Sequence, residues 1–321
     1  MLVSIITAAY NEERNLPVLY LRLAQVLEAM AVQWEWIVVD DHSSDGTFQA
    51  VARMAAEDPR VRGIRLSRNF GSHAARTCGL HHAGGACAIA MAADLQDPPE
   101  TIPALLEKWR EGAQLVTAVR SRRLGETAGT IWFSRLYHWI MRSLVGMKEL
   151  PAGGGFHLMD RRVLESFLQF RETRTSAIAL AHWMGFRQAS VTYEQQPRLH
   201  GHSGWTLEKK INLVVDSVTA FSFFPVRLMS CAGVAIAASG FLYSAWLVAR
   251  TLRGHALQGW AALMAVVLIL GGMQMIMIGI LGEYLWSALA ESRRRPRYLI
   301  EESVGIETAA STGESPVSGG P

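Results

Sequence analysis

What this 321-residue chain lacks excludes several classes of protein. It has only three cysteines, an odd number without the spacing of a zinc site or a disulfide framework. We therefore expect buried thiols in a reducing compartment. Its histidines show no metal-ligand spacing, and no long Lys/Arg run indicates a nucleic-acid partner. The first residues lack the basic segment and cleavage site of a signal peptide, so we expect them to form a first strand inside the fold.

The charge of the chain is small and unevenly distributed. The net charge is +3, but the last 21 residues contain four Glu and no Lys or Arg, so the rest of the chain is more basic. A modestly basic body suits a membrane surface or substrates that carry phosphate, although this balance is common and proves neither.

Short apolar runs alternate with helical patterns over residues 1–200. This alternation predicts an α/β fold with a mainly parallel sheet and helices on both faces. In such sheets, ligands bind along the edge where the strands end. The predicted strands are Val3–Thr7, Trp36–Asp40, Val61–Leu66, Ala86–Ala92 and Leu115–Val119. The predicted helices are Leu16–Met30, Gly46–Glu57, Ala74–Ala83 and Pro99–Trp109.

The composition changes after Trp205. Residues 206–227 mix charged and apolar side chains, which predicts an amphipathic connector lying at a membrane interface. Leu228–Ala249 contains no charged residue, and a second charge-free stretch, Gly254–Gly282, follows a short polar break. A 22-residue helix spans roughly 33 Å, enough for a hydrocarbon core of about 30 Å. We predict transmembrane helices at 228–250 and 258–290; the alternative is a buried helical hairpin in a soluble protein.

Two crossings would return the chain to the side on which it began. The Arg-rich stretch Arg293–Arg297 would then share a compartment with residues 1–205, and the positive-inside rule makes that compartment the cytoplasm. Arg250 and Arg253, between the two apolar stretches, weaken this bias without reversing it. The sequence thus predicts a multi-pass protein of the cytoplasmic (inner) membrane. Residues 291–321 are expected to be a cytoplasmic basic cluster and a tail, disordered from Glu307.

The strongest local signal is the acidic stretch Asp94–Glu100, directly after an apolar strand. The Asp94 carboxylate and the Gln96 amide oxygen are hard ligands that suit Mg²⁺ or Mn²⁺ bridging a diphosphate. The alternative is a capped turn, in which Asp97 is the N-cap before Pro98 at the first helical position. The two interpretations are compatible, because Asp97 can cap while the other two residues coordinate.

Other candidate residues give weaker signals. The stretch Asp40–Thr47 follows another strand and has the carboxylates and hydroxyls that bind a base or ribose, but Ser44 or Asp45 can equally cap the next helix. Asn11–Glu13 can be a simple turn. Four arginines are candidates for holding anionic phosphates, against the alternative of ordinary surface positions. They are Arg120, Arg123, Arg135 and Arg198.

Taken together, several stretches resemble glycosyltransferase family 2, whose catalytic domain has the nucleotide-binding GT-A fold. The resemblance is closer to its polyprenyl-phosphate branch, the bactoprenol glucosyltransferases and dolichyl-phosphate mannosyltransferases, and it covers about residues 1–302. The order and spacing of many stretches carry it. They are Tyr10–Glu13, Val39–Asp41, Arg68–Gly71, Asp94–Glu100, Trp183–Phe186, Trp205, Phe221–Pro225 and Gly282–Trp286.

The resemblance implies a GT-A-like catalytic domain over residues 1–205 and a role for each site residue. Tyr10, Glu12 and Asp41 would hold the donor, a nucleotide-sugar with UDP as the favoured nucleotide, with Asp41 near the base. Asp94 and Gln96 would coordinate the metal on the diphosphate. The residues that would hold the acceptor, a polyprenyl phosphate at the membrane edge, are Arg120, Arg135, Arg198 and Ser203. The paired apolar helices would anchor the enzyme in lipid or form a homo-oligomer, and the reaction would be a single inverting displacement.

The sequence departs from the family pattern at three places. Ala92 stands where an acidic residue often precedes the equivalent of Asp94, and a basic residue usually stands where this chain has Gly204. Gly153–Gly155 replaces a stretch that commonly carries an Asp. These changes fall where relatives handle the sugar and the acceptor. They leave open a transferase with another lipid or glycan acceptor, or an inactive nucleotide-binding membrane protein of the same fold.

Overall fold

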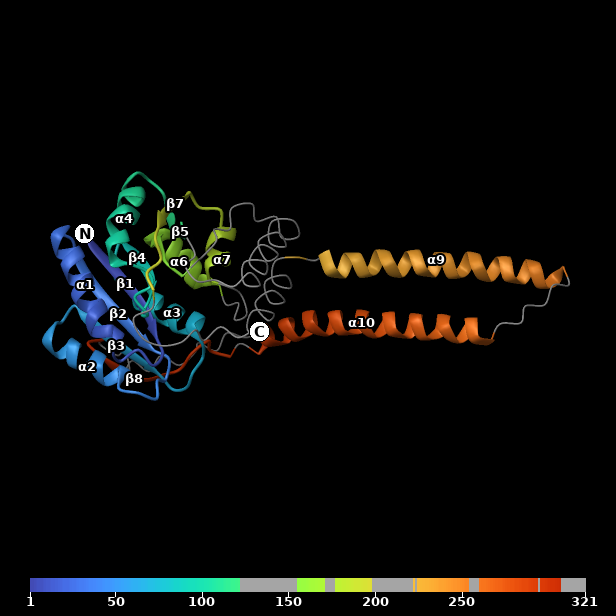
Figure 1. The fold of residues 1–321 in the computed structure, drawn as a ribbon, viewed down its shortest axis with the longest axis horizontal. Coiled ribbons are helices and arrows are strands. Elements are labelled where there is room, and N and C mark those ends of the chain that lie inside the picture. The colour runs from blue at the N-terminus through green and yellow to red at the C-terminus, as the bar shows by residue number, and fades with distance from the viewer. Residues whose placement is uncertain are drawn as a thin grey trace, which may run out of the picture.

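The fold is an eight-stranded mixed sheet with helices on both faces and two long apolar helices extending from one end (Figure 1). It is described by a computed structural model for residues 1–121, 155–170, 177–197, 222, 224–253, 260–293 and 295–306. The strand order is β7-β5-β6-β4-β1-β2-β3-β8. This arrangement confirms the α/β class that the sequence predicts.

Each of the five predicted strands is present. The strands are β1 Leu2–Ala9, β2 Gln33–Asp40, β3 Val61–Leu66, β4 Cys87–Ala92, β5 Leu115–Arg120, β6 His157–Asp160, β7 Gln188–Tyr193 and β8 Ile300–Val304. The pairs β1–β2, β1–β4, β2–β3 and β5–β7 are parallel, whereas β6 and β8 pair antiparallel to their neighbours. Six strands therefore end at the same edge of the sheet.

The helices form a layer on each face of the sheet, and the four predicted ones are present. One layer contains α1 Asn15–Ala29, α2 Thr47–Glu57 and, after a short 3₁₀ turn Pro99–Thr101, α4 Ile102–Arg110. The other contains α3 Ser72–His81, α6 Arg161–Gln169 and α7 Ala177–Trp183. Because strands such as β1 are covered on both faces, they appear in the sequence as continuous apolar runs.

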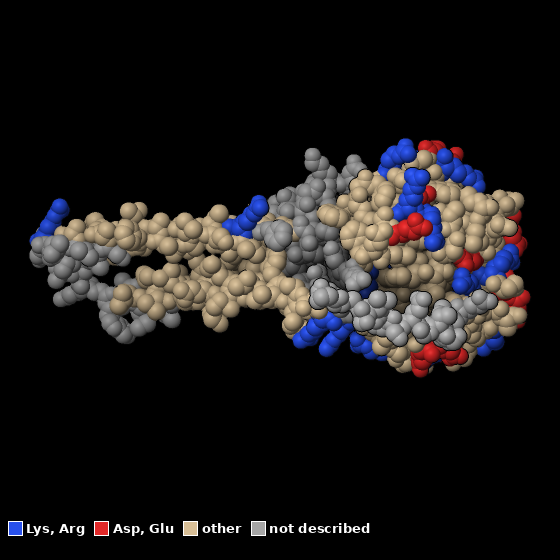
Figure 2. All heavy atoms as spheres, turned by 180° about the vertical axis from the view of Figure 1, so that it is seen from behind, with Lys and Arg blue, Asp and Glu red and all other residues tan. Residues whose placement is uncertain are grey.

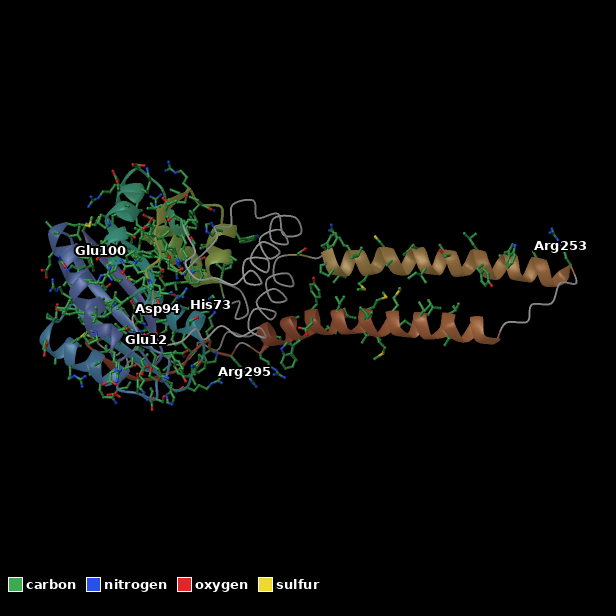
Figure 3. All side chains as sticks on the ribbon, viewed as in Figure 1. Glu12, His73, Asp94, Glu100, Arg253 and Arg295 are labelled. Carbon is green, nitrogen blue, oxygen red and sulfur yellow. The ribbon has the colours of Figure 1, made fainter. Side chains whose placement is uncertain are left out.

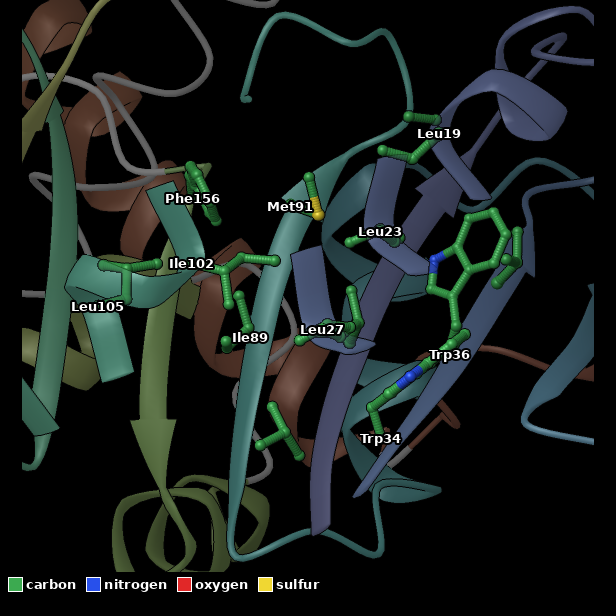
Figure 4. Packing of buried hydrophobic residues seen from close by; sticks show 14 of the residues in the cluster. Leu19, Leu23, Leu27, Trp34, Trp36, Ile89, Met91, Ile102, Leu105 and Phe156 are labelled. Carbon is green, nitrogen blue, oxygen red and sulfur yellow. The ribbon is translucent and has the colours of Figure 1, made fainter. Parts of the chain in front are cut away.

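The core under α1 explains why this segment is helical (Figure 4). Leu19, Leu23 and Leu27 recur every four residues, lie on one face of the helix and are fully buried. Each contributes about 1.5–3 kcal/mol of burial free energy. Trp36 of β2 is also fully buried, and its indole N–H donates to Thr7 Oγ1 at 2.9 Å, so the core leaves this polar group satisfied.

The two long helices are α9 Phe224–Leu252 and α10 Trp260–Ser292. Phe224–Tyr243 and Ile269–Trp286 are long and apolar enough to cross a membrane by length and composition, and neither stretch is buried within the structure. Figure 2 shows that few charged side chains lie along these helices. Of the predicted connector 206–227, only residue 222 and the start of α9 belong to the described residues.

Beyond the apolar helices the chain returns to the sheet, which corrects the assignment of 291–321 to a basic cluster and tail. Ile300–Val304 is strand β8, paired antiparallel with β3. The Ser67 N–H donates to the Leu299 carbonyl at 2.9 Å, and Arg65 forms an ion pair with Glu301 at 3.1 Å. The sheet therefore contains residues from both sides of the helical hairpin and does not end at residue 205.

Candidate active site

The predicted site residues of the described chain gather where the parallel strands end. In the register, Ala9 of β1 pairs with Asp40 of β2, and Ala8 pairs with Ala92 of β4. Tyr10, Asp41 and the Asp94 stretch follow these strands directly. Arg120 pairs with Tyr193 at the end of β5 and β7 and completes the same edge.

The turn after β4 presents Asp94 and Gln96 outward. Leu95 between them has a φ of 60°, in the left-handed region that costs a bulky residue of order 1–3 kcal/mol. Because of this turn, Asp94 and Gln96 are half-buried while Leu95 and Asp97 are buried. The Gln96 backbone N–H donates to Asp94 Oδ1 at 3.3 Å, which holds the turn between the two candidate metal ligands.

Asp97 does not act as the predicted helix cap. The N-cap of the following 3₁₀ turn is Pro98, without a side-chain cap. Asp97 instead accepts the Tyr193 hydroxyl at 2.5 Å and the Ala92 N–H at 3.3 Å. Arg120 Nε donates to the Tyr193 oxygen at 3.1 Å. This series of hydrogen bonds joins the loop after β4 to the ends of β5 and β7, and burial raises the pKa of both Asp97 and Tyr193.

Asp41 is buried and holds the loop after β3. Its two carboxylate oxygens accept the N–H groups of Phe70 at 2.7 Å and Gly71 at 2.8 Å. Gly71 has a φ of 93°, which glycine adopts readily. Burial raises the pKa of Asp41, while the two backbone donors act in the opposite direction. The Arg68–Gly71 stretch and Asp41, which carry the family resemblance separately, therefore form one structural unit.

The loops after β1 and β2 are joined by hydrogen bonds. Asn11, with a φ of 58°, accepts the Ser44 N–H at 2.9 Å, and the Glu12 N–H donates to Thr47 Oγ1 at 2.9 Å. Asp45 accepts the Thr47 N–H at 3.1 Å and so helps to begin α2, although Gly46 holds the N-cap position.

Tyr10 and Glu12, which the resemblance places at the nucleotide, differ in exposure and contacts. Tyr10 is 49% exposed and lies directly after β1, at the edge of the sheet. The Glu12 carboxylate accepts the Asn15 amide at 2.5 Å, which connects the loop after β1 to the start of α1.

Arg76 of α3 is a site residue that the sequence analysis did not identify. Its guanidinium interacts electrostatically with Asp97 and Asp94. Burial lowers its pKa, but an arginine side chain remains charged at neutral pH. A Cβ added at Gly155 would lie 3.7 Å from Arg76 Nη2 and 3.8 Å from Asp97 Oδ2. In the sequence, the one feature that could have drawn attention to Arg76 was its position as a single arginine among small residues. It lies in the segment Ala74–Ala83, which was predicted to be a helix.

A divalent metal held by Asp94 and Gln96 would have to take most of its ligands from a substrate. Within the described residues, no group of three or more His, Cys, Asp or Glu side chains could hold a metal ion. The Asp94 carboxylate and the Gln96 amide oxygen could supply two ligands, and Mg²⁺ is commonly bound by one or two carboxylates together with substrate phosphates. The remaining predicted acceptor residues, Arg135, Arg198 and Ser203, lie outside the described residues.

Comparison with known families and proteins accounts for both parts of the chain. The model of glycosyl transferase family 2 matches residues 4–194, and that of the GtrB C-terminal hairpin matches residues 224–287. The chain belongs to glycosyl transferase family 2 and is a glycosyltransferase, as the resemblance predicted.

Similar proteins extend over nearly the whole chain. An uncharacterized glycosyltransferase of Synechocystis sp. is 35% identical over 306 residues, 95% of this chain and 96% of its own length. The bactoprenol glucosyl transferase of Shigella phage SfV is 35% identical over 308 residues, 94% of this chain and 98% of its own length. The crystal structure of mannosyl-3-phosphoglycerate synthase from Rubrobacter xylanophilus shares the fold, with a TM-score of 0.51 and 17% identity over 73% of this chain and 75% of that one.

Proposed function

We propose that this enzyme transfers a sugar from a nucleotide-sugar, with UDP as the nucleotide, to a polyprenyl phosphate at the cytoplasmic face of a membrane. The observation that carries the proposal is the similarity along 94% of the chain to proteins named bactoprenol glucosyl transferase. The apolar hairpin supports it, because a lipid-linked acceptor brings its phosphate to the membrane surface.

The donor would bind where β1, β2 and β4 end. The exposed ring of Tyr10 can stack on a base, and Glu12 and Asp41 belong to the loops that would surround the nucleotide. Asp94 and Gln96 would hold Mg²⁺ or Mn²⁺. When bound, such a cation offsets the negative charge that develops on the departing diphosphate.

The chemistry requires little proton transfer from the protein. A phosphate monoester is already ionised at neutral pH, so one of its oxygens can attack the anomeric carbon directly. A new carbon–oxygen bond forms as the bond to the diphosphate oxygen breaks, with inversion at that carbon. The protein's contribution is then orientation and charge stabilisation. Arg120 at the end of β5, together with Arg135, Arg198 and Ser203, would hold the acceptor phosphate.

The place where the chain returns to the sheet supports the proposed membrane arrangement. Arg295 lies next to the catalytic domain, while Arg253 lies at the far end of the hairpin (Figure 3). Because β8 pairs with β3, the hairpin begins and ends on the same side. An even number of crossings satisfies this requirement, and the Arg293–Arg297 cluster favours the cytoplasm for that side.

The decisive experiment measures transfer of radiolabelled sugar from a panel of nucleotide-sugars to undecaprenyl phosphate in purified membranes, with and without Mg²⁺ or Mn²⁺. We expect a metal-dependent lipid-linked product with one donor. A product only with another lipid or glycan would assign a different acceptor. Nucleotide binding without any product would contradict the proposed transfer and favour an inactive member of the fold.

A further inference from the structure

Arg76 is a residue of the site to which neither the resemblance nor the comparisons assign a role, and Gly155 lies opposite it. Arg76 lies on α3, and its side chain is partly exposed. Within the part of the chain that the structure describes, its guanidinium makes no hydrogen bond or ion pair. Opposite it, Gly155 leaves open a position 3.7 Å from Arg76 Nη2. A carboxylate side chain at this position would pair with Arg76, so the glycine leaves the cation available to another anion.

The position of α3 indicates which anion this is. α3 and α7 lie on the side of the catalytic domain nearer to α9 and α10, whereas α1 and α2 lie farther away (Figure 1). His73, in the first turn of α3, lies nearer to the hairpin than Glu12 and Asp94 (Figure 3). A phosphate that arrives from the membrane therefore approaches α3, while the nucleotide residues lie deeper along the edge of the sheet.

The acceptor phosphate needs a cation nearby because other groups around it in the site are negatively charged. The reaction brings a phosphate monoester towards a diphosphate and towards the carboxylates of Asp94 and Asp97. The negative charges of these groups repel each other strongly when they lie close together in a partly buried site. The donor's charge would be met by the cation that Asp94 and Gln96 would hold, whereas Arg120 uses its Nε for Tyr193 and has only its terminal N–H groups left for the acceptor phosphate.

We propose that Arg76 binds the phosphate of the lipid acceptor, in the space that Gly155 leaves open. The inference rests on the proposed function, because it takes polyprenyl phosphate as the acceptor. It assigns Arg76 a binding role and makes Gly155 a determinant of acceptor binding.

The first test compares Arg76→Gln, Arg76→Lys and the wild-type full chain in lipid nanodiscs. Initial rates are measured at varied undecaprenyl phosphate with saturating donor, and then at varied donor with saturating undecaprenyl phosphate. We expect Arg76→Gln to raise the KM for the acceptor about 10- to 100-fold, the size of a lost charge-assisted hydrogen bond. Arg76→Lys should recover part of this loss. Donor KM and the Kd of UDP should stay within about twofold of the wild type.

A second pair of variants tests the same inference at Gly155, which lies opposite Arg76. Gly155→Ala adds a carbon at ordinary contact distance, so acceptor KM should change little. Gly155→Asp adds a carboxylate beside Arg76 and should raise acceptor KM about as much as Arg76→Gln does. Arg162→Gln removes an exposed arginine of α6 and serves as the matched control.

The outcomes separate this inference from the proposed function. If the wild type transfers no sugar to undecaprenyl phosphate, the proposed function itself is wrong. If the wild type is active and folded Arg76→Gln keeps its acceptor KM, Arg76 does not bind the acceptor. A raised donor KM or a weakened UDP affinity in Arg76→Gln would place the arginine on the donor diphosphate and overturn the inference.

Discussion

At the level of single residues, the two aspartates after β4 have different surroundings although they are close in sequence. Asp94 is half-buried beside Gln96, whereas Asp97 is buried and accepts hydrogen bonds from Tyr193 and Ala92. The left-handed Leu95 produces this difference by turning the chain between them. The Asp94 carboxylate is therefore partly exposed at the edge of the sheet, whereas the Asp97 carboxylate holds the loop in place.

Replacing Asp94 should impair sugar transfer and leave the fold intact. We expect Asp94→Ala to lower the transfer rate at least about 100-fold. It removes a proposed ligand of the metal ion that would stabilise the charge on the departing diphosphate. Its thermal unfolding and membrane association should remain close to those of the wild type. Glu107→Ala, on the exposed face of α4, is the control. Normal turnover by Asp94→Ala would remove this residue from the proposed metal site.

Asp97 should make stability depend on pH in a defined direction. Burial raises its pKa above the ordinary value of 3.8, so the fold favours the protonated carboxyl. Its contribution to stability therefore increases as the pH falls from neutrality through the raised pKa, and each tenfold difference in proton affinity between the folded and unfolded chain is worth about 1.4 kcal/mol. We expect the Tm of the wild type to rise relative to that of Asp97→Asn between pH 7 and pH 4. A difference that stays constant over this range would contradict the raised pKa.

The sequence predicted some residues of this edge and missed others for a physical reason. Asp94 and Gln96 directly follow a buried apolar strand, so their location is visible in one dimension. Tyr193 and Arg76 reach the same place from β7 and α3, far along the chain. Only the strand order β7-β5-β6-β4-β1 brings them together, and that order cannot be deduced from local patterns.

At the level of elements, whether a strand could be predicted from the sequence depends on how much of it is buried and apolar. β1 to β5 consist largely of buried apolar residues and were predicted. β8 contains Glu301 and Glu302 and is largely exposed at the edge of the sheet, so its composition resembles that of a tail. β6 has only four residues and includes the buried His157. Both strands exist because of tertiary pairing, which overrides weak local preference.

Gly63 of β3 pairs with Val304 of β8. A Cβ added there would lie 2.6 Å from Val51 Cγ1 and 2.8 Å from Val304 Cγ2, too near for either to remain in place. We expect Gly63→Ala to lower the free energy of unfolding by about 1–3 kcal/mol. Urea unfolding measures this loss, and limited proteolysis should cleave residues 295–306 sooner. Glu302→Gln, on the exposed part of β8, should change neither result.

At the level of the whole molecule, the hairpin is an insertion between two parts of one sheet. β8 covers the edge of β3, and Arg297 donates to the Phe170 carbonyl at 2.7 Å. The segment after α10 is therefore part of the catalytic domain. This segment contacts the loop after β2 through the His42–Glu301 pair at 3.3 Å and β3 through the Arg65–Glu301 pair.

Two truncations of the full chain test the contribution of this segment. A chain that ends at residue 306 keeps β8, and we expect its catalytic domain to unfold at the wild-type temperature. A chain that ends at residue 299 lacks β8 and exposes the β3 edge, so its Tm should fall by several degrees, about 2–4 °C for each kcal/mol lost. Both should still associate with membranes. Equal Tm values would show that β8 contributes nothing to stability.

The return of β8 also sets an order for biosynthesis. The ribosome makes β8 after both apolar helices, so the edge of β3 stays open until the hairpin has been synthesised. A chain with only one helix inserted would leave β8 on the opposite side of the bilayer from β3. We expect such misinserted chains to be the ones that aggregate or are degraded, because their sheet keeps an unpaired edge. We therefore expect completion of the sheet to require that both helices are inserted.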